Sequence, residues 1–326
     1  MIISVAVSGK EYELQVEPIT QICGTNIVLK EKLVSDIRKY FENSKGMQRI
    51  KIDGKEVGRN FLDLCFIDSR EGIVSAFKMG KNTVFNRYVT RQIQAIDIQK
   101  EMGKIDICLI KVFEMFNEVI TKSIGKISIN YELEDIFNMV QKTAITTDEG
   151  DDIASLTNYE LLVSFINLQK SILENAPSKT IIIVNNVDHM LTRNEYKRLL
   201  KMCKSITDNL DISFIFTTSL DGYILINEEN ISGINIVNDE ITCLFSVEDI
   251  RTYINDSYPV NYRFSNERII EMLEKIVNYI GDYEYETDMQ SQVVLFLINR
   301  TNAIKNKVKT VLNKAENAFL YDGNMV

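Results

Sequence analysis

The sequence predicts an α/β protein whose α/β part is divided by a helical insertion and followed by a helical extension. Three observations predict it. Thr180–Phe216 contains a strand, a helix and a second strand, and both strands are almost wholly apolar, which is typical of a βαβ unit. Two short extended runs, Ile2–Val7 and Tyr12–Glu17, begin the chain. Between about residues 71 and 175 the apolar residues recur at helical spacing instead.

The N-terminal segment is predicted from its turns and its periodicity. Asp53-Gly54 between two extended runs indicates a tight hairpin turn. Val34, Ile37 and Phe41 fall at helical spacing. The predicted elements are the strands Ile2–Val7, Tyr12–Glu17 and Thr25–Leu29, the helix Glu31–Glu42, and the strands Arg49–Ile52, Lys55–Val57 and Phe61–Ile67.

The rest of the chain alternates between helical and extended patterns. Thr192 with Glu195 three residues later forms a capping box, which marks a helix start. Met102-Gly103 is predicted to separate two long helices. The predicted helices are Asn82–Lys100, Lys104–Lys122, Leu133–Lys142, Asn158–Glu174, Thr192–Ser205, Val247–Ile254, Asn266–Tyr279 and Asp288–Phe319. The predicted strands are Thr180–Val184, Ile212–Phe216, Ile234–Val237 and Thr242–Phe245.

These elements divide the chain into four segments. Residues 1–70 form the first part of an α/β head, and residues 177–250 form its second part. Residues 71–176 form a helical leg between them. Residues 251–326 form a helical extension that ends in a short strand.

Composition excludes several classes of protein. The first residues lack the basic start and apolar core of a signal peptide, and no stretch approaches the roughly 20 apolar residues of a membrane helix. We therefore expect a soluble, cytoplasmic protein without membrane contact. Five widely spaced cysteines argue against disulfides and zinc. His189 is the only histidine, so a Ser-His or Cys-His catalytic centre is not expected.

Charge is polarised along the chain. Residues 1–126 have a net charge of +4, residues 127–250 of −12 and residues 251–326 of −1, within a total of −9. Such a distribution permits a basic surface on an acidic protein.

The order of strand, helix and later Ile-Ile-Ile-Val strand is also that of a P-loop ATPase core, but the nucleotide motifs are missing. The predicted strand Thr25–Leu29 is followed by Lys30-Glu31-Lys32, without the glycines and the Lys-Ser or Lys-Thr pair that bind phosphates. Asn185-Asn186 follows the later strand, where carboxylates would hold Mg²⁺ and activate water. The alternatives are a degenerate P-loop fold without catalysis or bound nucleotide, an ATPase with an atypical phosphate loop, and a fold unrelated to ATPases.

Several short motifs, in this order and spacing, resemble the Csn-two family, the accessory spacer-acquisition proteins of type II-A CRISPR systems, in its long form. The resemblance covers roughly residues 17–225 and the last few residues. The motifs are Glu17-Pro18-Ile19, Gly24-Thr25 with Asn26-Ile27-Val28-Leu29, Val112-Phe113-Glu114, Ile127–Glu132 leading into Leu133–Val140, Ile181–Asn185 with Leu191-Thr192 and Glu195, and the terminal Asn324-Met325-Val326.

The resemblance implies a degenerate P-loop-like α/β head with a helical leg. It implies a ring-shaped homotetramer that threads double-stranded DNA ends through a basic hole. The implied partners are the CRISPR integrase complex and the RNA-guided effector nuclease. It also implies calcium binding near residues 126–135, where Ser128 and Asn130 now replace acidic positions and leave fewer charged ligands. The remaining candidate ligands are Glu114, Glu118, Glu132, Glu134 and Asp135.

Three basic clusters are candidate DNA contacts. Residues 72–96 and residues 289–315 contain no acidic side chain. No motif for reading bases is visible, so contact with backbone phosphates is expected. An ordinary solvated helix face is the alternative for each cluster. The candidates are Lys78, Lys81, Arg87 and Arg91; Lys197, Arg198, Lys201 and Lys204; and Arg300, Lys307 and Lys314.

The sequence therefore predicts a non-catalytic, sequence-independent protein that binds double-stranded DNA ends as a ring during spacer acquisition. An ATPase of the same fold class and a purely structural interaction subunit are the alternatives.

Overall fold

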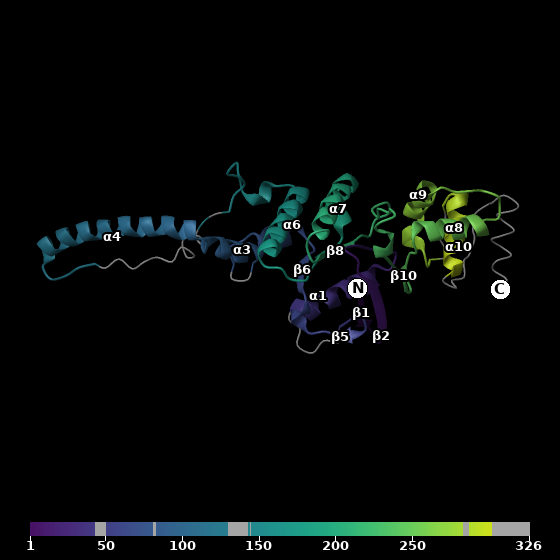
Figure 1. The fold of residues 1–326 in the computed structure, drawn as a ribbon, viewed down its shortest axis with the longest axis horizontal. Coiled ribbons are helices and arrows are strands. Elements are labelled where there is room, and N and C mark those ends of the chain that lie inside the picture. Colours follow the sequence, from purple (N-terminus) through teal and green to yellow (C-terminus); the bar gives the residue numbers. More distant parts are fainter. Residues whose placement is uncertain (43–49, 81–82, 130–142, 144, 283–286, 302–326) are drawn as a thin grey trace. The chain divides into compact units, whose positions relative to one another are not determined.

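The computed structural model describes residues 1–42, 50–80, 83–129, 143, 145–282 and 287–301 (Figure 1). Its contacts divide the chain into two compact units. Unit 1 comprises Met1–Ser69 and Leu173–Val326, and unit 2 comprises Arg70–Ile172. The chain has a mixed α/β fold with two sheets, both of which lie in unit 1.

The larger sheet has six strands in the order β10-β9-β3-β8-β7-β6. These are β3 (Ile19–Cys23), β6 (Asp63–Ile67), β7 (Thr180–Val184), β8 (Ile212–Thr217), β9 (Ile234–Val237) and β10 (Ile241–Cys243). All neighbours are parallel except β10, which runs antiparallel to β9. Every residue of β3, β7 and β9 is buried, as expected of a sheet covered on both faces.

The smaller sheet is antiparallel, in the order β2-β1-β4-β5. Its strands are β1 (Ile2–Val7), β2 (Lys10–Gln15), β4 (Lys51–Ile52) and β5 (Lys55–Glu56). Asp53 and Gly54 both have positive φ, so the predicted tight turn between β4 and β5 is confirmed. Helix α1 (Ile27–Glu42) shares one core with both sheets, since its Leu33 and Ile37 are buried together with Ile3 of β1 and Ile183 of β7.

One predicted strand is wrong. Residues 25–29 are not extended, because β3 precedes them and α1 begins at Ile27. The apolar run of Ile27, Val28 and Leu29 resembles a strand, yet Ile27 and Val28 are 53% and 77% exposed while Leu29 is buried. Asn26 caps the helix by accepting a hydrogen bond from the Leu29 amide at 3.0 Å.

Unit 2 is mainly helical. It contains α2 (Arg70–Ala76), α3 (Val84–Ile93), α4 (Ile96–Ile124) and most of α6 (Asn158–Asn175). The predicted break at Met102-Gly103 is wrong, because α4 runs through it and the break lies at Gln94-Ala95 (Figure 1). One glycine costs a helix only about 1 kcal/mol, which a helix of 29 residues tolerates. The predicted helix Leu133–Lys142 lies outside the described residues.

The remaining helices belong to unit 1. They are α7 (Arg193–Thr207), α8 (Val247–Ser257), α9 (Asn266–Ile276) and α10 (Met289–Thr301). The capping box of Thr192 and Glu195 is confirmed at the start of α7. Helices α8, α9 and α10 form one core with β9, and every residue from Ser291 to Asn299 is buried there. Short 3₁₀ turns lie at Arg59–Phe61, Ile153–Ser155, Val187–His189, Ile231–Gly233 and Val277–Tyr279.

No described helix has the length and apolar character needed to cross a membrane.

Candidate functional site

The connection between β3 and α1 joins a strand of the parallel sheet to the next helix, the kind of connection in which a phosphate-binding loop would lie. Because β3 ends at Cys23, this connection is Gly24-Thr25-Asn26 and not the predicted Lys30-Glu31-Lys32. Gly24 has φ of +108°, and a Cβ there would meet the Val237 carbonyl oxygen at 2.3 Å. The glycine thus lets β3 and β9 approach closely, which is a structural need.

The backbone donors of this connection are already bonded within the protein. The Thr25 amide donates to Asn238 Oδ1 at 2.6 Å, and the Gly24 amide donates to Asn278 Oδ1 at 3.3 Å. The Asn26 amide donates to the Val237 carbonyl at 3.2 Å. A phosphate loop needs these N–H groups free, because they wrap the phosphate oxygens.

Lys30 and Glu31 are bonded internally too. Lys30 is 4% exposed, and its Nζ donates to the Thr218 carbonyl at 2.6 Å. Burial lowers the pKa of Lys30. The Glu31 carboxylate accepts hydrogen bonds from the side-chain amides of Asn185 at 3.2 Å and Asn186 at 2.8 Å. The two asparagines therefore bind a neighbouring carboxylate at the end of β7.

Asp188, His189 and Ser219 meet beside this region but do not form a catalytic triad. Asp188 Oδ2 accepts from the Ser219 hydroxyl at 2.9 Å and from the Ser219 amide at 2.8 Å. His189 Nε2 lies 3.1 Å from the same hydroxyl. In a triad the histidine stands between the acid and the serine, whereas here the serine stands between them. A serine that donates its proton to a carboxylate is not activated by the imidazole.

Two cysteines of the head are buried and unreactive. Burial raises the pKa of Cys23 to about 12 and raises that of Cys203 still further. All five cysteines are free thiols.

The candidate calcium ligands are only partly described. Glu114 and Glu118 lie one turn apart on α4, and both are exposed. Glu132, Glu134 and Asp135 lie outside the described residues. Within the described ranges, no three His, Cys, Asp or Glu side chains are grouped to hold a metal ion.

The basic side chains at and before α3 are exposed. Arg87 and Arg91 lie on one face of the helix, four residues apart, and Lys78 precedes them. The side chains of these three residues form no ion pair or hydrogen bond with any described residue. Lys81 lies outside the described residues. Three positive charges are therefore available to an anionic partner at this place.

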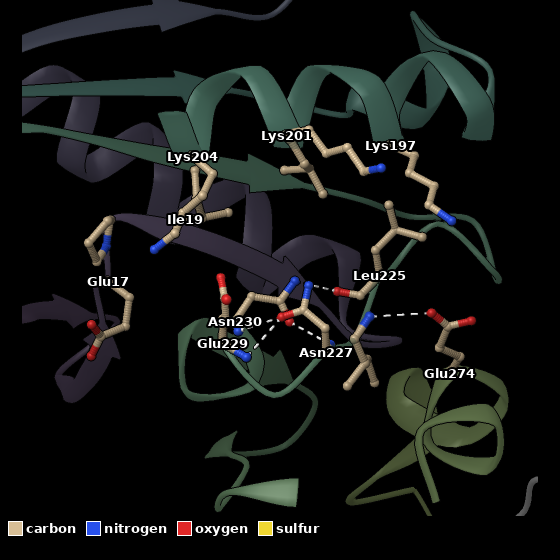
Figure 2. A pocket seen from close by; sticks show the side chains of 13 residues that line it. Glu17, Ile19, Lys197, Lys201, Lys204, Leu225, Asn227, Glu229, Asn230 and Glu274 are labelled. Carbon is tan, nitrogen blue, oxygen red and sulfur yellow. Dashed lines mark hydrogen bonds between the residues drawn. The ribbon is translucent and has the colours of Figure 1, made fainter. Parts of the chain in front are cut away.

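The basic residues of α7 have a different setting. Lys197, Lys201 and Lys204 line a pocket of about 420 Å³, together with carboxylates of other segments (Figure 2). Arg198 is exposed on the same helix but does not line the pocket. Sequence reasoning missed these acids because Glu17, Glu229 and Glu274 are far from α7 in the sequence.

The third predicted cluster is largely outside the described part. Arg300 is exposed near the end of α10. Lys307 and Lys314 lie outside the described residues.

Comparison with known proteins settles the family. A model of the family described as CRISPR-associated protein Csn2 subfamily St matches residues 8–313. The chain belongs to this family. The resemblance seen in the sequence is thereby confirmed. No curated protein matches this Csn2-family chain.

One solved structure shares the fold of this Csn2-family chain. The crystal structure of Stu0660 of Streptococcus thermophilus matches with a TM-score of 0.84 and 19% identity, covering 99% of both chains. At that identity the match establishes the shared fold. The structure of cbiO1 from Clostridium perfringens, part of the ABC transporter complex cbiONQ, has a TM-score of 0.40 and 14% identity, covering 79% of this chain and 93% of that one. That value is too low to support a conclusion.

Proposed function

We propose that this Csn2-family chain is a non-catalytic protein that binds double-stranded DNA without regard to sequence and takes up DNA ends as a ring-shaped homotetramer during spacer acquisition. Its partners in this proposal are the CRISPR integrase complex and the RNA-guided effector nuclease. Membership of the CRISPR-associated family supports the setting. The observation that carries the DNA-binding part is the set of exposed basic side chains Lys78, Arg87 and Arg91, which have no ion-pair partner among the described residues.

The closed connection after β3 supports the absence of catalysis. We regard the head as a degenerate P-loop-like fold, in which Lys30 and the loop amides bond to protein groups that replace phosphate. Asn185 and Asn186 supply no carboxylate for a metal ion. A nucleotide would have to break several buried hydrogen bonds to enter, so neither ATP binding nor hydrolysis is expected.

The surface of α4 supports self-association. No residue of α4 is buried, and large apolar side chains such as Met115, Phe116 and Val119 are 56% to 69% exposed. An apolar face of this kind is stabilised when another apolar surface covers it. We therefore include the homotetramer in the proposal. Calcium binding by Glu114 and Glu118 with Glu132, Glu134 and Asp135 stays part of it as well.

The ring is tested by comparing DNA forms. A closed ring can be threaded by a linear duplex but not by a covalently closed circle. A gel-shift titration should compare a linear fragment with a relaxed circle of the same sequence, and we expect the linear form to bind at least about tenfold more tightly, a difference of roughly 1.4 kcal/mol. The same circle cut once by a restriction enzyme is the control, and it should regain the linear affinity. Equal affinities for the circle and the cut circle would exclude binding by a closed ring.

A further inference from the structure

The pocket beneath α7 has walls from several segments of unit 1. Helix α7 forms one wall, and the start of β3 with the residues before it, the loop of residues 225–230 and Glu274 of α9 form the others (Figure 2). Its volume of about 420 Å³ lies within the range of small-ligand pockets, roughly 300–1,000 Å³. Ile19, Leu200 and Ile226 supply buried apolar surface to it.

A buried amide fixes the two main walls relative to each other. The Gln21 side chain of β3 accepts a hydrogen bond from the Tyr196 hydroxyl of α7 at 3.0 Å and another from the Leu225 amide at 3.1 Å. Its Nε2 donates to the Leu225 carbonyl at 2.8 Å. Gln21 and Tyr196 are at most 1% exposed. These hydrogen bonds hold the two walls at a fixed separation.

The loop wall is braced internally. Asn227 Oδ1 accepts from the amides of Glu229 and Asn230, both at 2.9 Å, and Asn230 Nδ2 donates to the Leu225 carbonyl at 2.8 Å. These bonds use the loop's own polar groups. What the pocket offers to a ligand is therefore its lysines, its carboxylates and its apolar surface.

Three ammonium groups lie along the α7 wall. Lys197 and Lys201 form no ion pair with a described residue, and Lys204 has only an exposed pair with Asp208 at 3.7 Å. On the other walls, Glu274 is paired with Arg193 at 2.8 Å. Glu229 is exposed and its carboxylate has no partner among the described residues.

This arrangement suits a short anion better than a DNA duplex. A duplex presents phosphates along its whole length, and the Glu17 and Glu229 carboxylates across from the lysines would repel them. A ligand that is anionic on one side only and apolar on the other matches both walls.

We propose that the pocket binds an extended acidic peptide segment of a partner protein, in which an apolar side chain lies between two carboxylates. Lys197 and Lys201 are four residues apart, so they are about 6 Å apart along the helix. Residues i and i+2 of an extended segment are separated by about 6.6 Å and point to the same side. Two carboxylates at i and i+2 can therefore pair with Lys197 and Lys201, while residue i+1 points toward Leu225 and Ile226.

The test uses the full chain and a fluorescein-labelled heptapeptide amide, Gly-Gly-Asp-Leu-Asp-Gly-Gly, followed by fluorescence polarisation at low salt. We expect saturable binding that weakens about fivefold when the leucine is replaced by glycine, because one buried apolar side chain is lost. Reversing two charges through Lys197→Glu with Lys201→Glu should weaken binding by about tenfold or more, since like charges then face each other.

Matched controls separate this site from general charge effects. Lys39→Glu with Lys55→Glu makes the same change of charge at exposed positions of the same unit that do not line the pocket, and its peptide affinity should stay within about twofold of the wild-type value. Glu229→Gln removes a repelling carboxylate without touching a lysine. It should strengthen peptide binding by about twofold, and it keeps the test valid if the lysine variant is misfolded.

Three results would overturn the proposal. The first is that the wild-type chain shows no saturable binding of the peptide. The second is that the pocket variant and the control variant lose peptide affinity equally. The third is that Lys197→Glu with Lys201→Glu weakens binding of a 30-base-pair duplex as much as it weakens binding of the peptide. The last result would assign the lysines of α7 to DNA. The ring and the role of Arg87 and Arg91 do not depend on any of these outcomes.

Discussion

Helices α3 and α7 look alike in the sequence but differ in their surroundings. Each has basic side chains repeated on one face, and either one is a plausible DNA contact on charge alone. The side chains of Arg87 and Arg91 have no partner among the described residues. The lysines of α7 face carboxylates across a pocket. A basic helix therefore indicates a polyanion only when no acids from other segments stand opposite it.

Lys30 represents a third environment for a basic side chain, the buried interior of the protein. Its Nζ donates to the Thr218 carbonyl, and the residue is 4% exposed. Lys30→Ala should lower the free energy of unfolding by about 2–3 kcal/mol, because it removes a charged hydrogen bond and buried side-chain atoms. Urea denaturation measures this loss.

Lys32→Ala is the matched control for that measurement. Lys32 lies two residues further along the same helix, and its exposed Nζ bonds only to the Ser8 hydroxyl among the described residues. Its substitution should change stability by less than about 0.5 kcal/mol. Equal losses in the two variants would show that the buried hydrogen bond of Lys30 does not contribute specifically to stability.

The double variant Arg87→Ala with Arg91→Ala tests whether the exposed basic face of α3 contacts DNA. We expect the affinity for linear duplex DNA to fall about tenfold at 50 mM salt, and the slope of log affinity against log salt to become shallower by about 1.8, which corresponds to two lost phosphate contacts. Gel shifts over a salt series measure both quantities. Lys39→Ala with Lys55→Ala removes the same charge from unit 1 and should leave the slope within error. An unchanged slope in the arginine variant would exclude these residues from the interface.

The next prediction concerns how much the capping box of Thr192 and Glu195 stabilises α7. Thr192→Ala should destabilise the chain by about 1 kcal/mol at pH 7. The Thr192 hydroxyl and amide hydrogen bonds hold the pKa of Glu195 below its usual value, so this contribution is present above the ordinary pKa of about 4.3. It is lost as the pH falls through the lower folded-state pKa. The difference between wild type and variant in urea denaturation should therefore shrink below about pH 4, and a difference independent of pH would exclude the ionised box.

Local signals predicted much of the fold. The run Ile181–Val184, the turn Asp53-Gly54 and the capping box at Thr192 each specify an element through their own chemistry, and each is confirmed. The strand β3 was missed, because Thr20 and Gln21 interrupt its apolar pattern. Both are buried and hydrogen-bonded to residues of the same unit, which the sequence does not reveal.

The candidate site was less predictable than the fold. The sequence placed Asn185-Asn186 at the end of a buried strand, but the misplaced strand Thr25–Leu29 hid the fact that Gly24-Thr25-Asn26 connects β3 to α1. The pocket of α7 joins Glu17 to Glu229 and Glu274, which lie more than 200 positions further along the chain. Only tertiary packing brings these carboxylates together, so no local sequence pattern predicts the pocket.

The smallest expected effect is the sharpest test of the comparison. Lys197→Ala with Lys201→Ala removes two charges, as the arginine variant does, so a model based on net charge alone predicts an equal loss of DNA affinity. We expect a change of less than about twofold at 150 mM salt, because facing carboxylates already offset the lysines and because exposed charges are screened beyond about 8–10 Å. The double variant Glu17→Gln with Glu229→Gln is the converse test. Without these carboxylates, the lysines of α7 should attract the duplex, and the DNA affinity should rise. Gel shifts should compare the DNA affinities of these variants with that of Arg87→Ala with Arg91→Ala. If both double variants lose affinity equally, surrounding carboxylates do not distinguish the two helices, and the DNA surface includes both.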